Sequence, residues 1–203
     1  MGKIFEGIDG KFRCSWCSAT ADYITYHDVE WGFPVSEDQR LFEKICLEGF
    51  QSGLSWRTIL SKRDNFRRCF LDFDFNKVAE FSRKDVDRLL RDSSIIRHRG
   101  KIEATINNAK RAKELIREKN SLAAYFWSFE PDSAMQGMTK KVAMSPESES
   151  IAKDLKKRGW RFVGPTTVYA FMQAMGLVNG HAEGCVMRSQ VAAARAKFEL
   201  PAS

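Results

Sequence analysis

LKKRGWRFVGPTTVYAFMQAMG, residues 155–176, reads as two helices joined by a short turn that has a glycine on each side. The first helix is expected to begin at residues 145–146, where Ser and Pro precede acidic residues. Gly159 should end it, because glycine readily takes the left-handed conformation that follows many helices. Pro165 opens the second helix, which stops at Gly176. The sequence therefore predicts a helical hairpin near its C-terminus.

The rest of the chain also shows helical periodicity. Residues 36–39 have the form of a capping box and precede apolar residues at helical spacing, which glycines interrupt from Gly49 onward. Residues 82–85 open another helix, and residues 97–120 form a long amphipathic one. Residues 130–141 lack periodicity, so we expect a loop there. Because no segment shows the alternation of a strand, we predict an all-α fold.

The composition fits one packed domain, residues 1–203, with 43% hydrophobic residues and a formal net charge of +7. The positive excess favours a polyanion such as nucleic acid, although charge alone decides little. Residues 1–14 lack the apolar core of a signal peptide, and no apolar run approaches the roughly 20 residues that span a bilayer. We therefore expect a cytoplasmic protein without membrane contact, whose five cysteines are reduced thiols.

Basic residues surround the turn of the helical hairpin. Its glycines allow a close backbone approach, and the free N–H groups at the start of the second helix favour a phosphate. This arrangement resembles a helix-hairpin-helix, which contacts the DNA backbone without reading sequence. An ordinary helical hairpin with a solvated basic face is the alternative. Residues 97–101 are a second candidate for a phosphate contact. The basic residues around the turn are Lys153, Lys156, Lys157, Arg158 and Arg161.

Cysteines and histidines gather at both ends of the chain. Cys14-x-x-Cys17 offers half of a metal site, and further donors come from His27 and from the pair His181 and Cys185. Two Cys and two His would complete a tetrahedral zinc site with no open position. Such a site would be structural and would join the N- and C-terminal segments.

Other interpretations of these residues stay open. A redox CxxC pair would want a preceding strand and a βαβ context, which the sequence does not predict. The thiols could instead be buried packing residues, with the histidines solvated. A zinc deaminase is excluded, because residues 27–30 have one residue more than the H-x-E signature and no Pro precedes Cys14.

Glu48 is the candidate recognition residue on the helix predicted after residue 36. It follows Leu41 and Ile45 along one face, which places its carboxylate at the rim of the buried side. A carboxylate among aromatic faces suits a flat cationic base. The alternatives are a solvated glutamate at a helix end and aromatic residues that only fill the core. The aromatic candidates are Trp16, Tyr23, Tyr26 and Trp56.

Five segments of the chain match a known family in collinear order. They are C-x-W with YITYHDVEWG (14–32), LFEKICLEGFQSGLSW (41–56), IIRHRGKI (95–102), YFWSF (125–129) and LKKRGWRFVGPTTVYAFMQAMGLVNGH (155–181). These segments resemble the 3-methyladenine DNA glycosylase I family over about residues 12–185, and the first dozen residues and the tail after Cys185 fall outside. The resemblance implies an all-α helix-hairpin-helix glycosylase that flips a methylated adenine out of duplex DNA and cleaves its N-glycosidic bond.

The resemblance also implies roles for individual residues. The zinc ligands would be Cys14, His27, His181 and Cys185, with Cys17 outside the set. Glu48 would bind the adenine edge, Tyr26 would hydrogen-bond to the base, and Trp16, Tyr23 and Trp56 would enclose it. The loop that fills the gap left in the duplex would be Gln51, Gly53 and Leu54. Further DNA contacts would come from Lys156, Lys157, Arg158, Arg161, Gly164, Thr166 and Thr167.

One departure concerns the catalytic Asp that the wider superfamily usually carries after the hairpin. Residues 177–181 contain none, and Glu183 is expected to be solvated. Because 3-methyladenine in DNA is cationic and leaves as a neutral base, the enzyme need not protonate it. We expect a monomeric, monofunctional glycosylase without lyase activity that releases 3-methyladenine from alkylated double-stranded DNA in the cytoplasm, close to the nucleoid. Zn²⁺ would be its structural metal, with no organic cofactor. The alternative is a zinc-containing DNA-binding module that releases no base.

Overall fold

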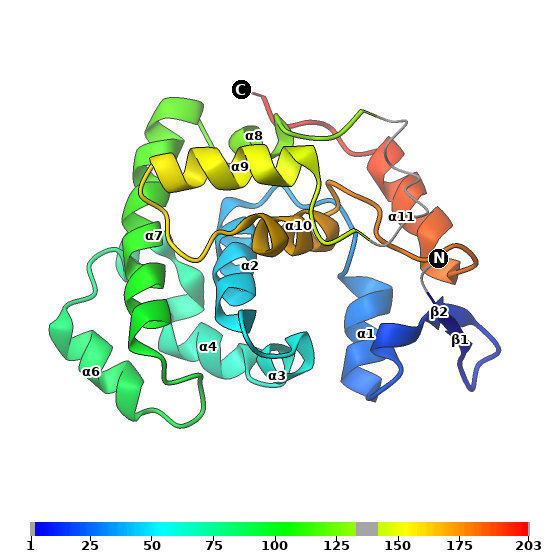
Figure 1. The fold of residues 1–203 in the computed structure, drawn as a ribbon, viewed down its shortest axis with the longest axis horizontal. Helices are drawn as coiled ribbons and strands as arrows, with labels where there is room; N and C mark the ends of the chain where they lie inside the picture. The colour runs from blue at the N-terminus through cyan, green and yellow to red at the C-terminus, as the bar shows by residue number, and fades with distance from the viewer. Residues whose placement is uncertain (1–2, 133–141, 203) are drawn as a thin grey trace.

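The computed structural model describes residues 3–132 and 142–202 and consists mostly of helices (Figure 1). Of the loop expected at 130–141, residues 133–141 lie outside the described part. In chain order the elements are β1 (Ile4–Glu6), β2 (Phe12–Cys14), η1 (Ser15–Cys17), α1 (Ala21–Val29), α2 (Asp38–Gln51), α3 (Trp56–Leu60), α4 (Arg63–Cys69), η2 (Leu71–Phe73), α5 (Phe75–Val78), α6 (Arg83–Arg91), α7 (Arg99–Lys119), α8 (Leu122–Trp127), α9 (Pro146–Lys157), α10 (Pro165–Ala174) and α11 (Val186–Ala196).

Helix α2 lies at the centre of the fold, between α7 and α10 (Figure 1). It also contacts α3 and α8, and its residues 41–50 are all buried. At its end, the ring of Phe50 lies 4.6 Å from that of Phe66 and 5.9 Å from that of Phe70, centroid to centroid. Phe70 in turn stacks on Phe73. This aromatic core fixes the C-terminal turns of α2, which carry Glu48.

Helices α9 and α10 lie side by side and form the predicted helical hairpin (Figure 1). The Ser145 side chain caps α9 by accepting a hydrogen bond from the backbone N–H of Ser148, and Pro146 occupies the first helical position. In the turn, Gly159 has a φ of +84°. Pro165 begins α10. The boundaries expected for both helices are confirmed within a residue or two.

The prediction of an all-α fold is wrong in one respect, because β1 and β2 form a two-stranded antiparallel sheet. Ile4 lies opposite Cys14 in the register. Each strand has only three residues, so no alternation of apolar and polar side chains could develop in the sequence. Calling the fold mostly helical, with one small hairpin at the N-terminus, is the correct description.

Two expectations about α2 are also wrong. The helix begins at Asp38 without a side-chain cap, so the capping box expected at 36–39 does not form. It also continues through Gly49 to Gln51. A Cβ atom at position 49 would lie 3.3 Å from the Cβ of Phe162, so glycine serves close packing against the hairpin turn rather than a break in the helix.

Other helix starts agree with the sequence. Ser82 and Asp85 form a capping box at the start of α6, where the sequence predicted the beginning of a helix. The long helix α7 begins two residues later than expected, with the His98 ring as its cap. The tail after Cys185 forms α11, which contacts β2, so this last helix lies beside the small N-terminal sheet (Figure 1). No helix in residues 3–132 and 142–202 combines the length and the apolar character that crossing a membrane requires.

Candidate active site and metal centre

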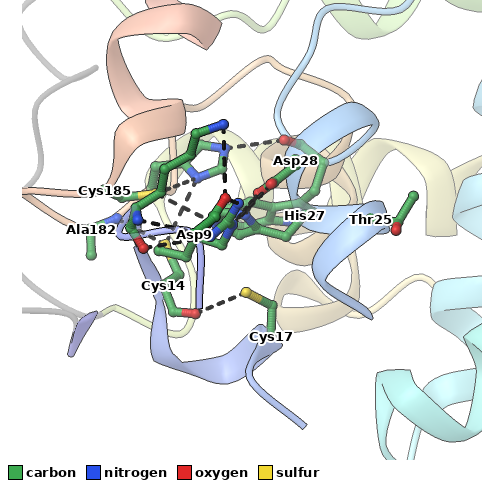
Figure 2. Close-up of polar contacts among 12 residues, drawn as sticks. Asp9, Cys14, Cys17, Thr25, His27, Asp28, Ala182 and Cys185 are labelled. Carbon is green, nitrogen blue, oxygen red and sulfur yellow. Dashed lines mark hydrogen bonds and ion pairs between the residues drawn. The ribbon is translucent and has the colours of Figure 1, made fainter. Parts of the chain in front are cut away.

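Four buried side chains from distant parts of the sequence form a cluster that could hold a metal ion. One ligand atom from each of Cys14, His27, His181 and Cys185 lies within 4.8 Å of the others. Cys14 ends β2, His27 lies in α1, His181 follows α10, and Cys185 caps α11. The structure therefore brings together the two Cys and two His that the sequence predicted, and with them the two ends of the chain (Figure 2).

Each histidine of this cluster has an outer partner that fixes its orientation. The Nδ1 atom of His27 lies 2.7 Å from the Asp28 carboxylate, and its Nε2 atom lies 3.5 Å from the Cys185 sulfur. In His181 the roles are reversed, with Nε2 3.1 Å from the Trp31 carbonyl oxygen and Nδ1 3.5 Å from Cys185. One ring nitrogen of each histidine therefore faces the sulfur atoms while the other faces an acceptor, as in metal-bound histidines.

The surroundings of the two cysteines in the cluster differ from those of Cys17. Hydrogen bonding with Cys14, and then with the two histidines, lowers the pKa of the Cys185 thiol, which favours the thiolate that binds metals. Cys14 accepts a hydrogen bond from the backbone N–H of Ala182. Cys17 is buried, but its thiol donates to the Cys14 carbonyl oxygen at 3.1 Å and its sulfur is not part of the cluster (Figure 2).

An open pocket of about 160 Å³ lies beside this cluster. Glu48 reaches it from the last turns of α2, and the aromatic side chains of α1, η1 and α3 form its walls. Trp16 lies between the pocket and the cluster of Cys and His side chains, because the centroid of its ring lies 5.0 Å from that of Tyr23 and 5.2 Å from that of His27. The lining residues are Trp16, Tyr23, Tyr26, Trp31, Glu48, Gln51, Trp56, Ala170 and Gln173. All five predicted base-recognition residues are among them.

Glu48 is buried and forms an ion pair with Lys44, whose Nζ atom lies 2.8 Å from Oε1. The same ammonium donates to the Tyr26 hydroxyl at 2.8 Å and lies 3.2 Å from the centroid of the Trp56 ring. Burial lowers the pKa of Lys44, and the ion pair with Glu48 opposes that effect. Burial, followed by the charge of Glu48, raises the pKa of Tyr26 well above its usual value, so its hydroxyl keeps its proton.

Comparison with known proteins identifies this combination of fold, pocket and cluster. The sequence profile of the methyladenine glycosylase family matches residues 16–189, which is most of the chain. The chain belongs to this family. It is accordingly an enzyme, a hydrolase of the glycosylase class.

Relatives of this glycosylase cover nearly the whole of the matched region. It is 48% identical over 177 residues to DNA-3-methyladenine glycosylase 1 of Escherichia coli (strain K12), covering 85% of this chain and 95% of that protein. A Haemophilus influenzae DNA-3-methyladenine glycosylase is 43% identical over similar shares. A crystal structure of 3-methyladenine DNA glycosylase I superposes with a TM-score of 0.79 at 46% identity, covering 86% of this chain and 98% of that one. A Staphylococcus aureus structure concerned with 3-methyladenine recognition has the same TM-score at 32% identity, covering 87% and 96%.

In this glycosylase, the segment after α2 projects away from the core. Gln51 is half-buried, whereas Gly53 and Leu54 are exposed, and Gly53 has a φ of +78°. Lys101 fixes the backbone at the start of this segment, since its ammonium donates to the carbonyl oxygens of Phe50 and Ser52 at 2.8 and 2.6 Å. Lys101 is buried by these contacts. The suggestion of a phosphate contact by residues 97–101 is therefore wrong for this lysine.

The helical hairpin of the glycosylase presents some of its predicted DNA contacts to solvent. Lys156, Lys157, Arg161 and Thr166 are exposed, and Gly164 and Thr167 are partly so. Arg158 is different, because it forms ion pairs with Glu118 and Asp154. The backbone of Arg161 is fixed to α7, where the Asn108 side chain accepts from its N–H and donates to its carbonyl oxygen.

Two residues that matter to the site did not emerge from the sequence. Lys44 lies one helical turn before Glu48, and this i, i+4 spacing is the only signal that could have paired them. Arg13 precedes the first cysteine and is buried despite its charge. Periodicity assigns charged residues to the surface, so it could not reveal either one.

Proposed function

We propose that this glycosylase excises 3-methyladenine from alkylated duplex DNA by flipping the base into the pocket and hydrolysing its N-glycosidic bond. The observation that carries the proposal is the buried carboxylate of Glu48 within a pocket walled by Trp16, Tyr23, Tyr26 and Trp56. Relatives named for 3-methyladenine, among them a structure in complex with that base, support the choice of substrate.

The pocket chemistry fits an electron-poor purine with an amino group. The aromatic faces stack on a cationic ring more strongly than on a neutral one. The Glu48 carboxylate accepts hydrogen bonds from the exocyclic amino group, and the Tyr26 hydroxyl, which accepts from Lys44, remains free to donate to a ring nitrogen. Trp56 adds a buried indole N–H that lacks a hydrogen-bond partner within the described residues. An adenine edge offers both an amino donor and ring acceptors.

The cleavage step then needs little proton transfer from the protein. The 3-methyladenine base is already positively charged in DNA, so it leaves as a neutral base when the bond to the sugar breaks. The developing charge on the sugar is balanced by the DNA phosphates, and water completes the hydrolysis. The ammonium groups of Lys44 and Lys101 are both engaged by protein acceptors, which supports water rather than an amine as the nucleophile and a reaction without lyase activity.

The cluster of Cys14, His27, His181 and Cys185 fits a structural Zn²⁺ ion. Two thiolates and two imidazoles are a common zinc donor set, and the four residues leave no open position for substrate. The ion would link β2 and α1 to the segment after α10. Its contribution to the pocket is indirect, because Trp16 and Tyr23 are carried by the same N-terminal segment.

DNA binding is assigned to two surfaces of the glycosylase. The exposed basic residues of the helical hairpin and the free N–H groups at the start of α10 would hold one phosphate backbone. The segment 51–54, with Leu54 exposed at 44%, would enter the duplex where the base has left. Insertion of an apolar side chain between base steps offsets part of the cost of unstacking. We further propose that the enzyme works as a monomer on DNA in the cytoplasm.

The direct test is incubation of the protein with duplex DNA treated with dimethyl sulfate, followed by identification of the released bases by chromatography and mass spectrometry. We expect free 3-methyladenine, with 7-methylguanine left on the DNA. Failure of a zinc-loaded, DNA-binding preparation to release any base would overturn the proposal and favour a DNA-binding module without catalysis.

A further inference from the structure

A series of ion pairs connects the cluster of Cys and His side chains to the N-terminal hairpin, which we define as residues 4–14. His27 bonds to Asp28 through Nδ1, as described above (Figure 2). The other side of Asp28 accepts from the Nε atom of Arg13, with distances of 2.9 and 3.1 Å to its two oxygens. Arg13 then forms a two-pronged ion pair with Asp9, in which both N···O distances are 2.7 Å.

The geometry of these ion pairs determines which nitrogen of His27 is available to a metal. Asp28 accepts a hydrogen bond from Nδ1–H, so the proton of the neutral ring lies on Nδ1 and the lone pair on Nε2. That Nε2 atom faces the Cys185 sulfur. Arg13 holds the carboxylate of Asp28 in place with a planar guanidinium, which fixes orientation better than a single flexible ammonium could.

Arg13 itself is held by the fold of the N-terminal hairpin. Its side chain is only 6% exposed, although it carries a charge. A Cβ atom at Gly7 would lie 2.6 Å from a guanidinium nitrogen of Arg13, so a larger residue at that position would require the tip of the arginine to shift. Asp9, in the turn of the hairpin, supplies the second carboxylate. The hairpin is therefore folded around a charged group whose Nε atom bonds to Asp28, the outer partner of His27.

The N-terminal hairpin also carries a ligand directly. Cys14 is its last residue and pairs with Ile4 across the sheet. The backbone N–H of Ser15 donates to the Lys3 carbonyl oxygen, which continues the contact between the two chain segments. All of these residues precede residue 16, where the match to the family begins. Gly7 and Asp9 also precede the segment that resembles the family, about residues 12–185, whereas Arg13 and Cys14 lie at its start.

We infer that the N-terminal hairpin retains the metal ion, with Arg13 and Asp9 acting as positioning residues that orient His27 through Asp28. The inference rests on the proposed zinc site and extends it to the segment that keeps the ion in place. Loss of an outer hydrogen-bonding partner of a metal-bound histidine typically lowers metal affinity by about 10–100-fold. The hairpin is expected to contribute an effect of that size.

The test compares zinc retention by the purified zinc-loaded protein and its Arg13→Gln variant. Zinc content is measured by elemental analysis, and release is followed with a chromogenic chelator. Arg13→Gln should weaken zinc affinity by about 10–100-fold and accelerate release. Asp9→Asn, which leaves Arg13 and Asp28 in place, should have a smaller effect in the same direction. Lys3→Gln is the matched control, because this exposed residue directly precedes the hairpin and the charge change is the same; it should retain zinc like the unmodified protein.

A second readout separates positioning from a general loss of stability. Nitrogen-15 NMR of the histidine side chains reports which ring nitrogen carries the proton. In the zinc-loaded protein His27 should be protonated at Nδ1, and Arg13→Gln should broaden or shift that signal while the His181 signal stays unchanged. If Arg13→Gln does not fold, Asp9→Asn provides both measurements.

The outcomes distinguish the inference from the proposal on which it rests. Normal zinc retention and an unchanged His27 signal in Arg13→Gln and Asp9→Asn would overturn the role of the hairpin and leave the zinc site intact. A folded parent protein that takes up no zinc would overturn both.

Discussion

The ammonium of Lys44 lies 2.8 Å from the carboxylate of Glu48, one turn apart on α2, and their side chains are only 7% and 5% exposed. Lys44 does not line the base pocket, yet it contacts three side chains that do. The negative charge of Glu48, which would face a cationic base, is therefore already neutralised by Lys44 when the pocket is empty. Through these contacts Lys44 holds the Glu48 carboxylate as an acceptor and the Tyr26 hydroxyl as a donor in a fixed arrangement.

Removing one member of this ion pair should lower the free energy of unfolding more than replacing both members with uncharged residues. Lys44→Met leaves a buried carboxylate without its partner, and the loss of one member of such a pair typically costs about 3–5 kcal/mol of unfolding free energy. The double variant Lys44→Met/Glu48→Gln removes the stranded charge and should recover a large part of that loss. Urea unfolding of the parent, both single variants and the double variant measures the coupling. Strictly additive losses would show that the two groups do not depend on each other.

Glu48→Gln should impair base release more than DNA binding. The amide keeps the size of the side chain, but it loses the charge-assisted hydrogen bond to the amino group of the base. Hydrogen bonds to charged groups contribute about 1.5–3 kcal/mol, so we expect release of 3-methyladenine to slow by about tenfold or more. Single-turnover release and a DNA-binding titration provide the two numbers.

A matched control for this variant exists on the same helix. Glu43→Gln changes another buried glutamate of α2, which pairs with Arg67 and does not line the base pocket. It should leave base release close to the parent rate. Equal rates for the parent and Glu48→Gln would remove Glu48 from the recognition site.

The limits of sequence-based prediction are visible in these residues. The two Cys and two His could be predicted as a set, because few residue types bind zinc and the chain places them at its two ends. The choice of Cys14 over Cys17 followed from family resemblance and not from spacing. Lys44 and Arg13 could not be predicted, since their burial depends on partners that only the folded chain brings near. The hairpin strands were missed because three residues are too few to show a period.

Zinc removal should destabilise the protein before it changes the chemistry of the pocket. Cys185→Ala removes one of four ligands, so the variant should contain less than one zinc per chain and melt at a lower temperature. Structural zinc sites in small peptides supply about 10–16 kcal/mol of apparent binding free energy at neutral pH, which makes a large shift the expected result. Elemental analysis and a thermal unfolding curve are the measurements.

Cys17→Ala serves as the control for the zinc prediction. Cys17 is as buried as the ligands, but its thiol donates to the Cys14 carbonyl oxygen and its sulfur, which also interacts with His27, lies outside the cluster. This variant should keep one zinc per chain and most of its thermal stability. Loss of zinc from Cys17→Ala together with its retention in Cys185→Ala would contradict the ligand set.

The helical hairpin supports a last prediction, which concerns the salt dependence of DNA binding. Arg161 is exposed beside the N-terminus of α10, and Asn108 fixes its backbone. If its guanidinium neutralises one phosphate, Arg161→Gln should weaken binding to all DNA sequences alike and reduce the slope of log K against log salt by about 1. Arg158→Gln should change that slope less, because Arg158 is already paired with Glu118 and Asp154. The control for this prediction is Lys197→Gln, at the end of α11 and away from the turn of the helical hairpin (Figure 1), which should leave the slope unchanged.

Binding titrations of the three variants and the parent at a series of salt concentrations give the slopes. A normal slope for Arg161→Gln beside a reduced one for Arg158→Gln would move the phosphate contact from the turn to the end of α9.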